Sequence, residues 1–150
     1  MISDAGTPTI SDPGVKIISE LYEKFNNEIN IIPIPGPTAL ISAISVSGFS
    51  SSEFIFYGFL PHKKGREKIF KEIAVNKKTS IFYESPHRLM KSLESLIEFC
   101  EENKEIFIAR ELTKIYEHKI KNKVVDIKKY FKNNPDKIKG EFVVVVKGIK

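Results

Sequence analysis

The stretch Ser80-Ile81-Phe82-Tyr83-Glu84-Ser85-Pro86-His87-Arg88 passes from a short apolar strand into a polar loop and then into a helix. The same succession recurs along the chain. Strands are predicted at 54–57, 80–83, 106–109 and 142–146, with a strand or ribbon at 116–125, and helices at 64–75, 87–102 and 127–131. Alternating strand and helix patterns are typical of an α/β layer fold.

The first third of the chain carries weaker signals of the same kind. Residues 1–2 are predicted to end a strand, and a helix is expected after them, with Asp12 as N-cap and Pro13 in its first turn. One buried face of that helix is predicted from helical spacing: Val15, Ile18, Leu21, Tyr22 and Phe25. A buried strand at 29–34 and a helix of small residues from Thr38 to about residue 47 complete this part.

Charge divides the chain near residue 53. Residues 1–53 hold two lysines and six acids, whereas residues 54–150 hold 22 basic and 13 acidic residues. The serine-rich segment 47–52 lies at this break, so two lobes are predicted, 1–52 and 53–150. A basic lobe suits an anionic polymer such as a nucleic acid. A general lysine bias explains the charge equally well, because lysines outnumber arginines 21 to 3.

Composition excludes several classes of protein. The chain has 150 residues, of which 41% are hydrophobic and 29% charged, as in globular domains. No apolar run approaches the ~20 residues that span a bilayer, so no membrane association is expected. The single cysteine, Cys100, leaves no internal disulfide or cysteine zinc site, which suits a reducing cytoplasm.

Polar and small residues collect directly after predicted strands, in four loops: 3–8, 35–40, 84–88 and 110–114. Ligands of open α/β sheets bind outside the carboxyl ends of strands, so these loops are the predicted site. Tight turns alone would also explain Gly6 and Gly36, and a structural ion pair would explain Glu84 and Arg88. Segment 59–66 is read either as a phosphate-binding loop or as a solvated basic loop.

Familiar cofactor motifs are missing from the sequence. The three histidines lie in separate segments without a partner four residues away, so no metal site is predicted. Neither the dinucleotide fingerprint nor the P-loop pattern occurs.

Taken together, five segments resemble one family. They are 3–14 (Ser-Asp-Ala-Gly-Thr-Pro and Ser-Asp-Pro-Gly), 35–40 (Pro-Gly-Pro-Thr-Ala-Leu), 56–61, 82–88 (Phe-Tyr-Glu-Ser-Pro-His-Arg) and 109–114 (Ala-Arg-Glu-Leu-Thr-Lys). In this order they are similar to the bacterial ribosomal RNA small subunit methyltransferase I family, within the tetrapyrrole methylase-like superfamily. The resemblance implies 2′-O-methylation of a cytidine in 16S rRNA, with S-adenosyl-L-methionine as cofactor.

The resemblance also carries expectations about architecture. It implies two α/β lobes with the cofactor cleft between them, and a homodimer. The family's opening strand, its proline-rich loop and an Asp-Thr-Arg segment are not found ahead of Ser3. The first lobe is therefore expected to be incomplete, and the chain to be an N-terminally truncated member whose isolated activity is in doubt.

Residue roles follow from the same resemblance and from residue chemistry. The residues assigned to the cofactor are Asp4, Ala5, Gly6, Thr7, Ile10, Thr38, Ala39, Glu84, Leu112, Gly140 and Glu141. Glu84 and Glu111 are the candidate catalytic proton acceptors. The residues expected to hold RNA phosphates are Lys63, Lys64, Arg66, Arg88, Arg110 and Lys114.

Two other functions stay open on the sequence. A methyltransferase of the same fold could act on a tetrapyrrole or another small molecule, which a non-basic cleft would favour. A non-catalytic fragment that binds RNA or dimerises is the third possibility.

Overall fold

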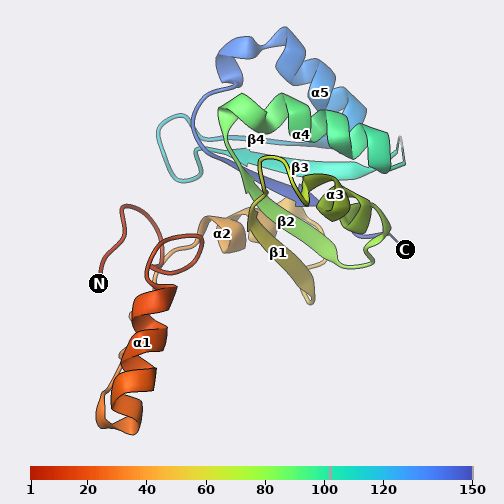
Figure 1. Ribbon diagram of the computed structural model, residues 1–150. Coiled ribbons are helices and arrows are strands. Elements are labelled where there is room, and N and C mark those ends of the chain that lie inside the picture. Colours follow the sequence, from red (N-terminus) through yellow and green to blue (C-terminus); the bar gives the residue numbers. More distant parts are fainter. Residues whose placement is uncertain (102, 150) are drawn as a thin grey trace. The chain divides into compact units, whose positions relative to one another are not determined.

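The computed structural model describes residues 1–101 and 103–149 (Figure 1). The chain forms two compact units, Met1–Ala39 and Leu40–Lys150, and each is described by itself. None of the described helices is both long and apolar enough to span a membrane.

The second unit is built on a five-stranded sheet with the order β1-β2-β5-β3-β4. Its strands are β1 (Phe54–Phe59), β2 (Thr79–Glu84), β3 (Glu105–Arg110), β4 (His118–Lys123) and β5 (Phe142–Val146). Strands β1 and β2 are parallel, and every other neighbouring pair is antiparallel. The parallel pair is joined through helix α3 (Arg66–Val75), as a crossover connection requires.

Helices cover both faces of this sheet (Figure 1). Helix α3, α4 (Pro86–Phe99) and α5 (Val124–Asn133) pack on one face around Phe82, Ile108 and Val144. Helix α2 (Ala39–Ser47) packs on the other face with Ile81 and Val145. Successive strand residues alternate between the two cores, which explains why β5 is apolar and buried at every position.

Most predictions for this unit are confirmed. The strands at 54–57, 80–83, 106–109 and 142–146 and the helices at 64–75 and 127–131 appear within two or three residues of their expected ends. Helix α4 starts at Pro86, directly after β2, with proline in its first turn. Its expected end at Glu102 lies outside the described residues.

The first unit departs from its predictions. Helix α1 spans Val15–Phe25 and follows Gly14, not Asp12, and the 3-10 turn η1 spans Asn26–Glu28. The buried face predicted for α1 is wrong, because no residue of this helix is buried and Val15 is 63% exposed. The strands predicted at 1–2 and 29–34 are also absent, and Ile34 is 78% exposed. An apolar strand forms only where a neighbour pairs with it, and residues 1–39 contain no strand.

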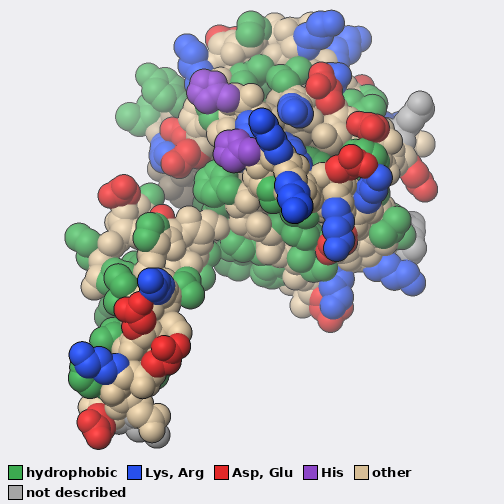
Figure 2. All heavy atoms as spheres, viewed as in Figure 1, with side chains coloured by type: hydrophobic (Ala, Val, Ile, Leu, Met, Phe, Trp, Pro, Cys, Tyr) green, Lys and Arg blue, Asp and Glu red, His purple; other side chains and the backbone are tan. Residues whose placement is uncertain are grey.

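The two compact units divide at Ala39, whereas the charge break predicts lobes dividing at residue 52. Helix α2 contributes Leu40, Ala43 and Ile44 to the core on its face of the sheet, so it belongs with the second unit. The lobe assignment 1–52 and 53–150 stays a prediction. The second unit still carries the basic excess, with 22 basic and 14 acidic residues among positions 40–150. Figure 2 shows lysine and arginine side chains spread over it.

Candidate functional site

Strand pairing brings two of the predicted loops, 84–88 and 110–114, and the turn at 140–141 to the same ends of the strands in the second unit, which we call the site edge. Phe142 at the start of β5 pairs with Glu84 at the end of β2 and with Arg110 at the end of β3. Arg110 also pairs with His118, the first residue of β4. Loops 84–88 and 110–114 and the turn before Phe142 therefore emerge together.

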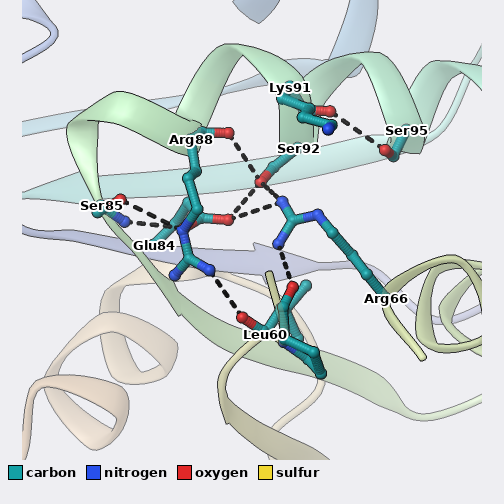
Figure 3. Close-up of polar contacts among 9 residues, drawn as sticks. Leu60, Arg66, Glu84, Ser85, Arg88, Lys91, Ser92 and Ser95 are labelled. Carbon is teal, nitrogen blue, oxygen red and sulfur yellow. Dashed lines mark hydrogen bonds and ion pairs between the residues drawn. The ribbon is translucent and has the colours of Figure 1, made fainter. Parts of the chain in front are cut away.

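A buried carboxylate, Glu84, organises the first part of this edge (Figure 3). Its side chain is fully buried, accepts from Arg66 Nη2 at 3.0 Å and forms an ion pair with Arg88, whose Nε lies 2.8 Å away. The Ser92 hydroxyl donates to Oε2 at 2.5 Å, and the Ser85 backbone N–H donates to Oε1 at 2.9 Å. Both carboxylate oxygens are thus occupied, each by one guanidinium and one neutral donor.

The two arginines extend this cluster to the loop after β1. Arg66 donates to the carbonyl oxygen of Pro61 at 3.2 Å, and Arg88 donates to that of Leu60 at 2.8 Å. The guanidinium of Arg66 also lies 5.2 Å from the ring centre of Phe70. The cluster therefore fixes loop 59–66 against β2 and α4. Because Arg88 joins Glu84 to the Leu60 carbonyl, this geometry favours the structural reading of the Glu84–Arg88 pair.

Glu111 organises the second part of the edge. Its Oε1 accepts from the backbone N–H of Glu141 at 2.7 Å and from Lys114 Nζ at 3.2 Å. The Glu141 N–H and the Lys114 ammonium lower the pKa of Glu111, although partial burial opposes them. Glu141 and Glu111 in turn raise the pKa of Lys114. Glu111 is consequently ionised at neutral pH.

Backbone geometry at this second cluster is unusual. Glu111 has φ 49° and Thr113 has φ 63°, in the left-handed region that non-glycine residues seldom adopt. Gly140 has φ 80°, and a Cβ there would stand 2.5 Å from the Glu111 side chain. A larger residue at position 140 would be strained by the positive φ and would have to displace the Glu111 side chain. The predicted residues Glu111, Gly140 and Glu141 are thus in contact, and Leu112 packs on the α2-side core.

Arg110 and His118 are paired residues of β3 and β4, and Arg110 lies beside this turn. Arg110 donates from Nε to the Lys139 carbonyl at 2.6 Å and is 9% exposed. His118 stacks on Tyr130 with ring centres 5.5 Å apart, and its Nδ1 is buried without a hydrogen-bond partner. Burial lowers the pKa of His118, and the nearby Lys137 and Arg110 add to the effect. Sequence reasoning did not select His118, because its position opposite Arg110 becomes visible only from strand pairing.

The six residues predicted to bind RNA differ in availability. Lys63 and Lys64 are exposed on the loop before α3. The guanidinium groups of Arg66, Arg88 and Arg110 are occupied by protein partners, and Lys114 is held by two carboxylates. Of the six predicted residues, Lys63 and Lys64 are therefore the ones that remain available to bind phosphate.

The first unit brings two further predicted loops together. The Thr7 hydroxyl donates to the Pro37 carbonyl at 3.2 Å, and a Cβ on Gly6 would stand 3.4 Å from that same oxygen. Asp4, Ala5, Ile10 and Ala39 are exposed, and Thr38 is half-buried. Loop 3–8 therefore lies against segment 36–38, as the assignment of both to one ligand requires.

These residues fit S-adenosyl-L-methionine by the chemistry of their donors. Small residues such as Ala5 and Gly6 permit close backbone approach to a nucleoside, and Thr7 and Thr38 supply hydroxyl groups. No three histidine, cysteine, aspartate or glutamate side chains in residues 1–101 and 103–149 are placed to hold a metal ion.

An α/β sheet unit with its polar loops gathered at one edge matches a known class of methyl-transferring enzymes. Residues 1–128 match the Tetrapyrrole (Corrin/Porphyrin) Methylases, and the chain belongs to this family.

Similar curated proteins carry a more specific name. Ribosomal RNA small subunit methyltransferase I of Thermotoga maritima is 40% identical over 99% of this chain, and that of Escherichia coli O157:H7 is 41% identical over the whole of it. The chain spans 64% and 52% of these two relatives, respectively.

Solved structures agree on the fold. The methyltransferase CobJ superposes with a TM-score of 0.68 at 22% identity, covering 95% of this chain and 62% of that one. Uroporphyrin-III C-methyltransferase of Thermus thermophilus, solved with S-adenosyl homocysteine, gives a TM-score of 0.59 at 11% identity, with coverage of 93% and 62%.

Proposed function

We propose that this chain takes part in S-adenosyl-L-methionine-dependent methylation of small-subunit ribosomal RNA, at the ribose 2′-oxygen of a cytidine. The observation that carries the proposal is the identity of about 40%, across almost the whole chain, to relatives named for methylation of this RNA. The basic character of residues 40–150 suits a polyanionic substrate.

The chemistry requires little of the protein beyond positioning and proton removal. S-adenosyl-L-methionine supplies an electrophilic methyl group on a sulfonium. The chain's residues must orient the ribose hydroxyl and accept its proton late in the transfer. Residues of loops 3–8 and 36–39 in the first unit would hold the cofactor.

Of the two candidate proton acceptors, Glu111 has the more suitable surroundings. Its contacts with Glu141 and Lys114 both involve Oε1, and no hydrogen bond from a described residue reaches Oε2. An ionised carboxylate with one open oxygen can accept a hydrogen bond from the 2′-hydroxyl. Glu84 has no open oxygen, so we assign it the positioning of loop 59–66 and of α4.

A direct assay separates the proposal from its nearest alternative. The protein is incubated with methyl-labelled S-adenosyl-L-methionine and either small-subunit ribosomal RNA or uroporphyrinogen III. Label in the RNA supports the proposal, whereas label in the tetrapyrrole alone would assign the activity that the family's description names. Label in neither, with RNA still bound, would indicate the non-catalytic RNA-binding reading.

Glu111→Gln should lower transfer at least tenfold, because an amide cannot take the proton. Affinity for S-adenosyl-L-methionine, measured by calorimetry, should change little. Glu67→Gln is the control, since its exposed carboxylate pairs with Lys71 and belongs to none of the assigned sites. Equal transfer by the Glu111→Gln variant and the wild-type protein would remove Glu111 from the mechanism.

Two further assignments belong to the proposal. A homodimer and a cytoplasmic location are what the family resemblance implies. Equilibrium sedimentation of the chain tests the first, because a monomer mass at micromolar concentration would contradict it.

A further inference from the structure

We propose that the outer strand of the sheet and the loop before it form a docking surface for single-stranded RNA. This β4 strip consists of Tyr116, Lys119, Lys121 and Lys123. The inference rests on the proposed function and names the part of the molecule that would hold the substrate's backbone.

Strand β4 is an edge strand whose lysines alternate. It pairs only with β3, so its other edge is open. Lys119, Lys121 and Lys123 occupy every second position and therefore point to one face, about 6.8 Å apart along the strand. Lys121 pairs with Phe107, a residue of the α2-side core, so this face is the one that carries α2. All three lysines are exposed.

The charge on this face remains positive after its ion pairs are counted. Lys119 pairs with Glu117, and Lys147 of the same face pairs with Glu105. Among the described residues, no carboxylate forms an ion pair with Lys121. Its Nζ donates to the Gly48 carbonyl at 3.4 Å and lies 4.4 Å from the ring centre of Phe49. The hydrogen bond from Lys147 lowers the pKa of Glu105, and the charge of Lys121 adds to this effect. This face therefore carries four lysines and two carboxylates, which leaves an excess of two positive charges. The lysines are Lys119, Lys121, Lys123 and Lys147, and the carboxylates are Glu105 and Glu117.

An exposed aromatic side chain stands at one end of this row. Tyr116 is 71% exposed, and its neighbour Ile115 is 94% exposed. The loop carrying them is braced, because Glu117 accepts from the Thr113 backbone N–H at 2.7 Å and Arg110 Nη1 reaches the Tyr116 carbonyl at 3.5 Å. Proteins hold single strands with an exposed aromatic ring near a row of cations, because bases stack on the ring and phosphates lie along the cations.

A different explanation exists for lysines on an edge strand. Charged side chains there prevent one sheet from pairing with another and so limit aggregation. That role requires charge of either sign, whereas RNA binding requires positive charge. Reversing the sign therefore separates the two explanations.

The test compares two triple variants of equal net charge. The strip variant carries Lys119→Glu, Lys121→Glu and Lys123→Glu, and its edge stays charged. The control carries Lys91→Glu, Lys129→Glu and Lys132→Glu on α4 and α5, at exposed positions over the opposite face. Affinity for a fluorescein-labelled single-stranded RNA of about 12 nucleotides is measured against salt concentration, because binding to phosphates depends on salt.

In the strip variant, the slope of log K against log salt should be smaller in magnitude by about 2, since each phosphate contact contributes about 0.7 on a single strand. The control should keep most of the wild-type slope. Tyr116→Ala should weaken binding roughly 5- to 150-fold, and Tyr116→Phe should restore it, because stacking needs the ring and not the hydroxyl. Circular dichroism and binding of S-adenosyl-L-methionine should match the wild-type protein in every variant.

If the slopes of the strip and control variants are equal, and both are smaller in magnitude than the wild-type slope, the β4 strip is not the docking surface. RNA binding by the second unit would remain supported. A wild-type chain that binds no RNA would overturn the proposed substrate as well. A strip variant that binds as well as the wild-type protein would leave prevention of edge pairing as the role of these lysines.

Discussion

At the scale of single residues, the buried carboxylate of Glu84 determines how the site edge is held. It forms ion pairs with Arg66 and Arg88, which in turn bind carbonyl oxygens of the loop after β1. The sequence placed Glu84 and Arg88 in one loop but could not place Arg66 beside them. Arg66 lies 18 positions earlier in the chain, and only the packing of α3 brings it to Glu84.

Glu84→Gln should destabilise the protein by about 3–5 kcal/mol, because it leaves the buried Arg66 and the half-buried Arg88 guanidinium groups without a countercharge. Urea unfolding followed by circular dichroism gives the free energy. Glu67→Gln breaks an exposed pair with Lys71 and serves as the control, with an expected loss of about 0.5 kcal/mol or less. Similar losses for both variants would contradict the structural role of Glu84.

Gly140→Ala should cost more than Gly65→Ala. Both glycines have positive φ, 80° and 87°, so both variants acquire about 1–2 kcal/mol of backbone strain. A Cβ at Gly140 also meets Glu111, whereas nothing lies within 4 Å of one at Gly65. The excess loss of unfolding free energy for Gly140→Ala therefore measures the Glu111 contact, and equal losses would show that the turn does not hold Glu111.

At the scale of elements, local patterns predicted the strands and helices of the second unit but not their arrangement. Phe142–Val146 was recognisable as a buried strand because all five residues are apolar. Its place between β2 and β3 depends on long-range pairing that no local pattern records. The same limit explains the errors in the first unit, where the apolar segment 29–34 lacks a neighbouring strand and stays irregular.

The contact between β4 and α5 predicts that the stability of the fold depends on pH. His118 stacks on Tyr130, and its folded-state pKa is lowered chiefly by burial. The unfolded chain therefore binds the proton more readily, so stability is complete above the unfolded pKa of about 6.5 and falls as the pH drops toward the folded pKa. His118→Phe keeps the stacked ring and should abolish this loss between pH 7 and 5.5 in thermal melts. An unchanged loss in that variant, or its disappearance in the exposed control His62→Phe, would contradict the assignment.

A second pH dependence belongs to the loop after β3. The folded-state pKa of Glu111 is lowered by the Glu141 N–H and Lys114, so its contribution is present above the unfolded pKa of about 4.5 and is lost as the pH falls below it. Unfolding free energies of the wild-type protein and Glu111→Gln should converge on acidification from pH 6 to pH 3. A constant difference over that range would show that the carboxylate charge does not hold the turn.

At the scale of the whole molecule, the charge of the second unit supports the proposed RNA substrate. The tetrapyrrole methylase family defines the fold, but its description names small-molecule substrates. The relatives at about 40% identity are named for ribosomal RNA, and the basic second unit agrees with them. The sequence indicated the family because its five motif segments, most of them at strand ends, occur in the family's order. It could not show which arginines are occupied by the protein itself, because that depends on packing.

The most direct test of the account is the position of the methyl group in small-subunit ribosomal RNA after incubation with this protein and labelled S-adenosyl-L-methionine. A 2′-O-methyl group protects the adjoining phosphodiester bond from alkali, because the attacking hydroxyl is blocked. We predict label in an alkali-resistant dinucleotide whose first nucleoside is cytidine. Label released by alkali as single nucleotides, or found on a base, would contradict it.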